Sequence, residues 1–200
     1  MKSIAIIIWG LIYFNPVNVT VEKWVIEKNS SLRIEGKSNV NGFKCDIVEY
    51  LNRDTIFLYK DASQAQMPVA TKGGLIININ RFDCHQNHIT ADLKKTLKAK
   101  ENAYMKINLL TLGHIEPNTS NQRITGYVEI HLAGITKKIE INYSVVKNQP
   151  GSLYLIGTKT VKFSDFMLTP PSKLAGLIKV EQDIKVRFEL MLRFVPTVAT

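Results

Sequence analysis

Four cysteine and histidine residues of this chain are the candidates for a zinc site, because such side chains serve as zinc ligands in other proteins. Cys84, His85 and His88 lie close together, and His131 lies on a later strand-like segment. Zinc sites show tighter, repeated spacings of such residues, and His131 alternates onto a polar face together with Glu129. The pattern therefore does not predict a metal site, and we expect the protein to need no cofactor.

Residue patterns typical of catalysis are also missing from the sequence. No serine lies in a Gly-x-Ser-x-Gly context, and there is no phosphate-binding loop or dinucleotide fingerprint. Asp165 has no second acid at a position typical of an acid–base pair, so we expect its carboxylate to order a turn through backbone amides. We therefore predict that the protein is not an enzyme.

The two cysteines each follow a phenylalanine by two positions, Cys45 in "NGFKCDIVEY" and Cys84 in "NRFDCHQNH". In a strand, each would share a face with that aromatic neighbour. A disulfide between them would close a long loop and contribute about 3–4 kcal/mol, whereas two buried reduced thiols on separate strands are the alternative. The sequence leaves both open, and export to an oxidising compartment would favour the bond.

The N-terminus has the composition of a secretory signal. Lys2 precedes the apolar run of residues 4–14, which is shorter than the roughly 20 residues that a membrane span needs. No small-x-small cleavage site follows, so an uncleaved anchor is the alternative. We predict a signal peptide over residues 1–20, a mature chain that starts between Val17 and Trp24, and a periplasmic location.

Length and charge exclude some classes of protein. The 200 residues fit one domain, which we place at residues 24–196. The formal net charge is +9, but the basic residues are spread singly along strand-like segments, as in Lys185, Arg187 and Arg193. A nucleic-acid-binding protein concentrates its charge in a stripe or tail. We therefore expect no nucleic-acid partner.

Alternation of apolar and polar residues is the main structural signal. In "GYVEIHLAG", Val128, Ile130 and Leu132 share one face, and Glu129 and His131 share the other. The same alternation recurs in residues 31–38, 42–50, 74–80, 104–112, 137–146, 152–163 and 183–194. We predict about nine or ten antiparallel strands that form a closed barrel or a sandwich, because short turns join regular strands.

Two places interrupt this rhythm. The parity of the apolar residues changes before Phe82, which indicates a bulge near Asn80. Residues 89–100 have helical spacing, with Thr90 as a candidate N-cap and four lysines on the polar side. A basic amphipathic helix could lie on an anionic membrane, but the narrow apolar stripe favours a helix that plugs the sheet.

Several motifs, in order, resemble the YceI-like family of exported bacterial proteins. They are Trp24, the pattern Gly36-x-Ser38-x-Val40-x-Gly42-Phe43, a "DLKKTLKA" helix before a Tyr-x-x-Ile strand, and a "LAGITK" hairpin. The segment "VKFSDFMLTPPSKLAGLIKVEQDIKVRFELML" completes the match with Asp-Phe, Pro-Pro and a final alternating strand. The resemblance covers nearly the whole chain after Trp24.

This resemblance implies a lipocalin-like antiparallel β-barrel with one inserted helix and an elongated apolar interior. It also implies a periplasmic, non-enzymatic protein that binds a polyisoprenoid or similar amphipathic lipid. The alternative is a side-chain-filled barrel that acts as a stress-response or protein-interaction module without a lipid. Two further interactions stay open. One is a membrane contact through the basic helix of residues 89–100, and the other is a homodimer.

If the interior holds a lipid chain, apolar residues at alternate strand positions should line it. We expect Met167 and Leu168 to close one end, because methionine tolerates irregular surroundings. The other expected ligand-binding residues are Phe43, Ile107, Val128, Ile130, Ile141, Leu155, Phe163, Val186 and Phe188.

Overall fold

The structure, a computed structural model, describes residues 19–47, 50, 52–64, 66–116 and 119–196. Most of the predicted signal peptide, residues 1–18, lies outside this part of the chain. The longer elements are β1 (Val19–Ile26), β2 (Ser31–Lys37), β3 (Gly42–Ile47), β4 (Thr55–Asp61), β5 (Val69–Asn78), α1 (Asn87–Thr96), β7 (Tyr104–Leu112), β8 (Asn121–Leu132), β9 (Ile135–Lys147), β10 (Ser152–Lys162) and β13 (Asp183–Val195). The short ones are η1 (Ala62–Gln64), η2 (Ile79–Arg81), β6 (Phe82–Asp83), η3 (Phe163–Phe166), β11 (Ser172–Lys173), η4 (Leu174–Gly176) and β12 (Ile178–Lys179).

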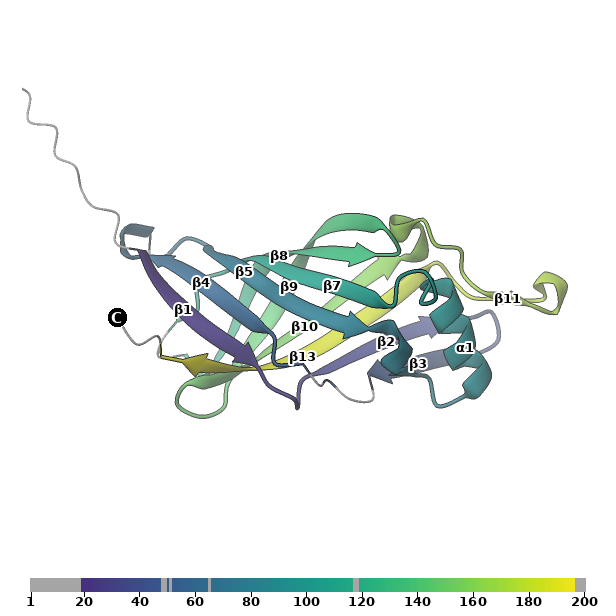
Figure 1. Cartoon of the computed structure of the whole chain (residues 1–200), viewed down its shortest axis with the longest axis horizontal. Helices are drawn as coiled ribbons and strands as arrows, with labels where there is room; N and C mark the ends of the chain where they lie inside the picture. The colour runs from purple at the N-terminus through teal and green to yellow at the C-terminus, as the bar shows by residue number, and fades with distance from the viewer. Residues whose placement is uncertain (1–18, 48–49, 51, 65, 117–118, 197–200) are drawn as a thin grey trace, which may run out of the picture.

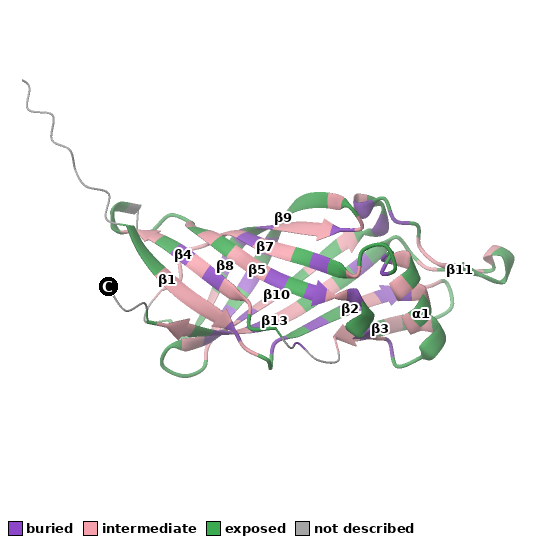
Figure 2. Ribbon diagram, in the orientation of Figure 1, coloured by how far each residue is buried: buried purple, intermediate pink, exposed green. Residues whose placement is uncertain are grey.

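Within the described residues, eight strands close into a barrel in the order β1–β4–β5–β7–β8–β9–β10–β13, and β13 pairs back to β1. Every neighbouring pair is antiparallel. Buried and exposed positions alternate along the strands, as Figure 2 shows, because successive side chains point to opposite faces. The predicted lipocalin-like barrel with an inserted helix is confirmed.

β13 joins two different parts of the barrel wall. One of its edges pairs with β10 over its whole length, from Lys162↔Asp183 to Ser152↔Arg193. Its other edge pairs with β2 in its first half and with β1 in its second half. The sheet continues from β2 to β3 and β6. In Figure 1, β1 and β4 therefore form one end of the elongated barrel, and β2, β3 and α1 form the other.

Side chains of the β3–β4 connection satisfy an unpaired edge of β5. The last β4–β5 pair is Ile56↔Gly73, so the backbone of Ile76 has no strand partner on that side. The Asp54 carboxylate accepts from the Ile76 N–H at 2.8 Å, and the Asn52 amide donates to the Ile76 carbonyl at 2.8 Å. An unpaired strand edge leaves backbone groups without partners, and here side chains supply them.

Helix α1 covers the end of the barrel. It begins at Asn87 with Gln86 as its N-cap, so the expectation that Thr90 is the N-cap is wrong. The Thr90 hydroxyl instead accepts from the Cys84 N–H at 2.9 Å. Leu93 is buried against the barrel, as is Leu97 just after the helix, while the lysines lie outside. The predicted inserted helix is confirmed, and it packs Leu93 on the barrel while Ile89 stays half-buried.

The parity change before Phe82 has a different cause from the bulge that we expected near Asn80. β5 ends at Asn78, and the 3-10 turn η2 follows before β6 resumes the sheet. The Asn78 side chain accepts from the Asn80 N–H at 3.0 Å and so begins this turn. A tight turn shifts the inward-facing positions as a bulge would, so the sequence pattern alone did not separate the two.

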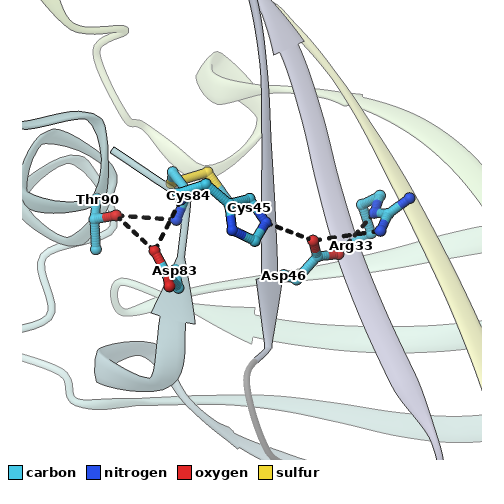
Figure 3. Close-up of a disulfide and its surroundings, with 7 residues drawn as sticks. Arg33, Cys45, Asp46, Asp83, Cys84 and Thr90 are labelled. Atoms are coloured by element: carbon cyan, nitrogen blue, oxygen red, sulfur yellow. Dashed lines mark hydrogen bonds and ion pairs between the residues drawn. A yellow bond between two sulfur atoms is a disulfide. The ribbon is translucent and has the colours of Figure 1, made fainter. Parts of the chain in front are cut away.

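A disulfide joins Cys45 on β3 to Cys84, which follows β6. Figure 3 shows it beside Asp46, whose carboxylate meets Arg33 at 2.6 Å and His85 at 3.2 Å. Burial would raise the pKa of Asp46, but the hydrogen bonds from Arg33 and His85 outweigh burial and hold that pKa below its usual value. The predicted proximity of the two cysteines is confirmed, and the Cys84 sulfur is not free to bind a metal.

Replacing both cysteines, Cys45→Ala with Cys84→Ala, should lower the free energy of unfolding by about 3–4 kcal/mol, because the unfolded chain loses a constraint. Their sequence separation is 39 residues. Urea denaturation of the variant and of wild type under reducing conditions should give the same loss. A loss below about 1 kcal/mol in both would contradict this account.

Candidate functional site

The barrel is filled at one end and hollow at the other. At the β1–β4 end, buried apolar side chains pack together; they are Ile26, Ile56, Leu58, Leu112, Ile124, Val145, Leu153, Leu155 and Leu192. Towards α1, a cavity of about 90 Å³ lies among side chains from β2, β5, β7, β8, β9, β10 and β13. The residue Leu97 and the turn η3 close its far end. No side chain of β1 or β4 reaches it.

Most of the residues that we expected to contact a ligand lie on this cavity wall. They are Ile107, Val128, Ile130, Ile141, Phe163, Leu168, Val186 and Phe188. These residues come from β7, β8, β9, β13 and the segment that follows β10. The alternation of apolar and polar residues placed each of them on the apolar face of its strand, and closure of the barrel brings those faces together around the interior. Their contact with a ligand stays a prediction.

Three expected residues lie elsewhere. Leu155 is fully buried in the packed end, and Phe43 lines an outer groove. Met167 is 76% exposed, so the expectation that it caps the interior is wrong. Met167 has a left-handed backbone, with φ of 52°, at the end of η3. This conformation directs its side chain outward, while Leu168 returns to the interior.

Two aromatic rings form the floor that separates the cavity from the packed end. The rings of Tyr143 on β9 and Phe188 on β13 meet edge to face, with centroids 5.6 Å apart. A Cβ at Gly157 would lie 2.1 Å from the Phe188 ring, and a Cβ at Gly126 would lie 2.4 Å from the Thr111 carbonyl oxygen and 3.1 Å from the Tyr143 ring. Two glycines inside strands therefore make room for two large rings. A glycine within a strand pattern is the sequence signal that could have located this floor.

The Tyr143 hydroxyl is a polar group in apolar surroundings. Among the described residues it has no hydrogen-bond partner, and its side chain lines the cavity. Burial raises the pKa of Tyr143 well above its usual value, so the hydroxyl stays protonated and can donate. An unsatisfied buried hydroxyl costs about 1–3 kcal/mol, a penalty that phenylalanine would avoid.

A second, more open space lies outside the barrel end. This outer groove, of about 460 Å³, runs between α1, the β2–β3 turn and the segment that contains β11 and β12. Val40, Phe43, Ile89 and Ile178 supply much of its apolar wall. Phe163 belongs to the walls of both the groove and the cavity, so its side chain stands between the two.

His131 and its acidic neighbour lie on the outside of the barrel. His131 contacts Glu129 at 2.7 Å on the polar face, as alternation predicts. Within the described residues, no group of three or more His, Cys, Asp or Glu side chains is placed to hold a metal. In the same part of the chain, no helix is long and apolar enough to cross a membrane.

Comparison with known proteins gives likeness in structure but not in sequence. No protein-family model matches the chain, and no curated protein matches it. BcnA of Burkholderia cenocepacia is 13% identical, with a TM-score of 0.59 over 81% of this chain and 95% of BcnA. A polyisoprenoid binding domain from Saccharophagus degradans, implicated in plant cell wall breakdown, is 12% identical, with a TM-score of 0.60 over 85% of this chain and 97% of that domain.

The YceI protein of Campylobacter jejuni is 14% identical over 98% of this chain and 94% of its own, with a TM-score of 0.49. At such identities, the likeness to BcnA and to the polyisoprenoid binding domain establishes a shared fold. Those two likenesses concern the fold of the chain. They agree with the barrel that the sequence motifs predicted.

Gly157→Ala should lower the free energy of unfolding by about 1–3 kcal/mol, because the new methyl group overlaps the Phe188 ring. Gly42→Ala is the matched control, since its Cβ would meet nothing closer than 3.6 Å. Thermal or urea unfolding of both variants measures the difference. Equal effects at the two positions would show that the floor of the cavity is not tightly packed.

Tyr143→Phe should leave the ligand-free protein as stable as wild type, or more stable by up to about 1 kcal/mol. The reason is that it removes a buried hydroxyl without a partner. Urea denaturation of protein stripped of lipid by organic solvent and refolded measures the change. A loss above about 1 kcal/mol would mean that the hydroxyl forms a bond within the protein.

Proposed function

We propose that this protein is a non-enzymatic binding protein for an isoprenoid or similar long-chain amphipathic lipid, held inside the barrel. The observation that supports the proposal best is the cavity itself. Its wall comes from seven strands and is apolar apart from Tyr143 and two lysines of β10. Apolar walls with few polar groups are typical of sites for lipids and other hydrophobic ligands. The polyisoprenoid binding domain that shares this fold is consistent with that choice.

The volume of the cavity limits how a long ligand would fit. At about 90 Å³ it is smaller than typical ligand sites, which span roughly 300–1,000 Å³. The outer groove adds about 460 Å³ beyond Phe163. We propose that the ligand displaces the Phe163 ring and occupies both spaces. The apolar residues of the groove, Phe43 among them, then contact the ligand as well.

Burial of an apolar chain supplies enough free energy for such a complex. About ten buried methylene groups, at ~0.8 kcal/mol each, contribute ~8 kcal/mol before the cost of ordering the chain. That value corresponds to micromolar affinity, and a longer prenyl chain adds to it. Burial of the apolar chain alone thus accounts for micromolar affinity, without hydrogen bonds or ion pairs to the ligand.

We propose a periplasmic location, with a signal peptide at residues 1–20 and the barrel domain at residues 24–196. The Cys45–Cys84 disulfide fits an oxidising compartment. β1 already includes Val19 and Thr20, which pair with β4. This pairing favours a cleavage slightly earlier than the predicted end at residue 20, so that the mature chain starts at or before Val19 and keeps both residues of β1.

The sequence left open a membrane contact through the basic helix of residues 89–100. Because Leu93 and Leu97 face the barrel, we propose that any contact there uses its exposed lysines alone. Such a contact would be electrostatic and weakened by salt. A homodimer and the absence of nucleic-acid binding remain predictions.

A second candidate function is a side-chain-filled barrel that serves as a stress-response or protein-interaction module without a lipid. The small volume of the cavity and the packed end of the barrel favour it. The two candidates differ in what the folded protein carries. Only the first requires a lipid in the interior.

Ile130→Trp should displace lipid from the cavity, at a cost of about 1–3 kcal/mol in stability from overpacking. The measurement is the amount of prenyl or other long-chain lipid per folded protein, by solvent extraction and mass spectrometry. Glu140→Gln, on the exposed face of β9, is the control and should retain wild-type lipid. Equal recovery from all three proteins, or none from any, would reject the interior as the binding site.

A further inference from the structure

A hydrophobic finger projects from the α1 end of the molecule. We call residues 169–180, which contain β11, η4 and β12, the finger, and Figure 1 shows it extending beyond α1. At its tip, the exposed fraction is 67% for Leu174 and 73% for Leu177. Val40, in the neighbouring β2–β3 turn, is 60% exposed. Single exposed apolar residues are ordinary, but three at one projecting end mark a surface for interaction.

Contacts within the protein hold the finger in place. The Asn39 side chain of the β2–β3 turn donates to the Leu177 carbonyl at 2.8 Å and accepts from the Lys179 N–H at 2.9 Å. On the other limb of the finger, the Lys173 ammonium group meets the Asp92 carboxylate of α1 at 2.8 Å. The turn, the finger and α1 are therefore tied together, and the exposed apolar side chains belong to a supported structure.

The backbone at the tip is itself unfavourable. Leu174 and Ala175 both have a φ of 52°, and Gly176 has a φ of 92°. Only glycine adopts this left-handed region without steric cost, and strained residues cluster at functional sites. Folding stability alone does not account for a tip that combines such a backbone with exposed leucines.

Basic residues border the tip. The finger contains Lys173 and Lys179 and no acidic residue, and Lys37 is exposed at the adjoining end of β2. Two acids lie nearby: Asp92, which pairs with Lys173, and the exposed Glu181 directly after the finger. Among the described residues, no carboxylate pairs with Lys179 or Lys37. Apolar side chains beside unpaired lysines are typical of segments that bind anionic membrane surfaces.

We propose that the finger and the β2–β3 turn dock on an anionic lipid membrane. Leu174, Leu177 and Val40 enter the layer between the head groups, and Lys179 contacts lipid phosphates. A protein partner fits less well, because three aliphatic side chains on a projecting tip offer far less than the roughly 800 Å² that each partner contributes to a stable interface. A fluid bilayer needs no complementary shape.

Docking at the finger brings the outer groove to the membrane surface. The groove lies between α1, the β2–β3 turn and the finger, and Phe163 separates it from the cavity. A lipid would then have a short path from the bilayer to the barrel. The inference goes beyond the proposed function and does not depend on it, since a barrel with a filled interior could dock in the same way.

A tryptophan placed at the tip reports whether the finger enters a lipid layer. Leu177→Trp, in the naturally processed protein, is mixed with vesicles of phosphatidylethanolamine and phosphatidylglycerol in equal parts. Its emission should move to shorter wavelength, because the indole leaves water for the membrane interface. Met67→Trp is the matched control, since Met67 is 57% exposed in the β4–β5 connection at the other end of the barrel. Its emission should not move, and the native tryptophans contribute equally to both proteins.

Further variants separate the apolar contribution from the electrostatic one. Leu174→Asn with Leu177→Asn should lower the vesicle affinity about tenfold or more, while asparagine tolerates the left-handed backbone of the tip. Lys179→Gln should lower the affinity several-fold at low salt, and added salt should remove this effect. Met67→Asn and Lys28→Gln, which changes an exposed lysine of the β1–β2 turn, are the controls and should bind as wild type does. Vesicles of phosphatidylcholine alone should bind wild type more weakly, because they carry no net charge.

Three results would overturn the inference. An unmoved emission of Leu177→Trp would show that the finger stays in water. Undiminished binding by the double asparagine variant would place the membrane contact elsewhere, for instance on the lysines of α1. No binding of wild type to either kind of vesicle would leave the tip as a surface for a protein. Lipid extraction from wild type and Ile130→Trp tests the cavity separately, so failure of docking and failure of the proposed function are distinguishable.

Discussion

The architecture depends on the way that one strand, β13, shares a single edge between two partners. Its first half pairs with β2 and its second half with β1, while its other edge stays with β10. β1 and β2 are consecutive in the chain, so they lie one after the other along the same edge of β13. The barrel therefore has two ends with different strands in their walls. One end closes through β1 and β4, and the other through β2, β3, the disulfide and α1. The same division separates a packed end from a hollow one.

Side-chain packing marks the boundary between the packed end and the hollow end. The Tyr143 and Phe188 rings cross the interior where the two ends meet, and Gly126 and Gly157 leave the space that the rings need. Leucine, isoleucine and valine fill the end beyond them. On the other side the inward side chains of seven strands leave a cavity, which Leu97 and η3 close. A close-packed core tolerates few voids, so a persistent apolar space beside a well-packed half is a specific property of this interior.

Polarity is uneven around the cavity. Its wall is apolar except for the Tyr143 hydroxyl and for β10, where half-buried Lys159 lies on the inner face. Phe163, the residue that follows β10, separates the cavity from the outer groove.

The sequence by itself determined which face of each strand turns inward, because side chains alternate strictly along an extended backbone. Ile107, Val128, Ile130 and Ile141 follow from that rule, and ordered motifs supported the barrel. Tertiary structure decided the rest. The left-handed backbone of Met167 turns its side chain outward, and pairing of β3 with β6 brings Cys45 to Cys84. Whether facing side chains meet or leave a cavity depends on contacts between strands far apart in the chain, and local alternation carries no information about those distances.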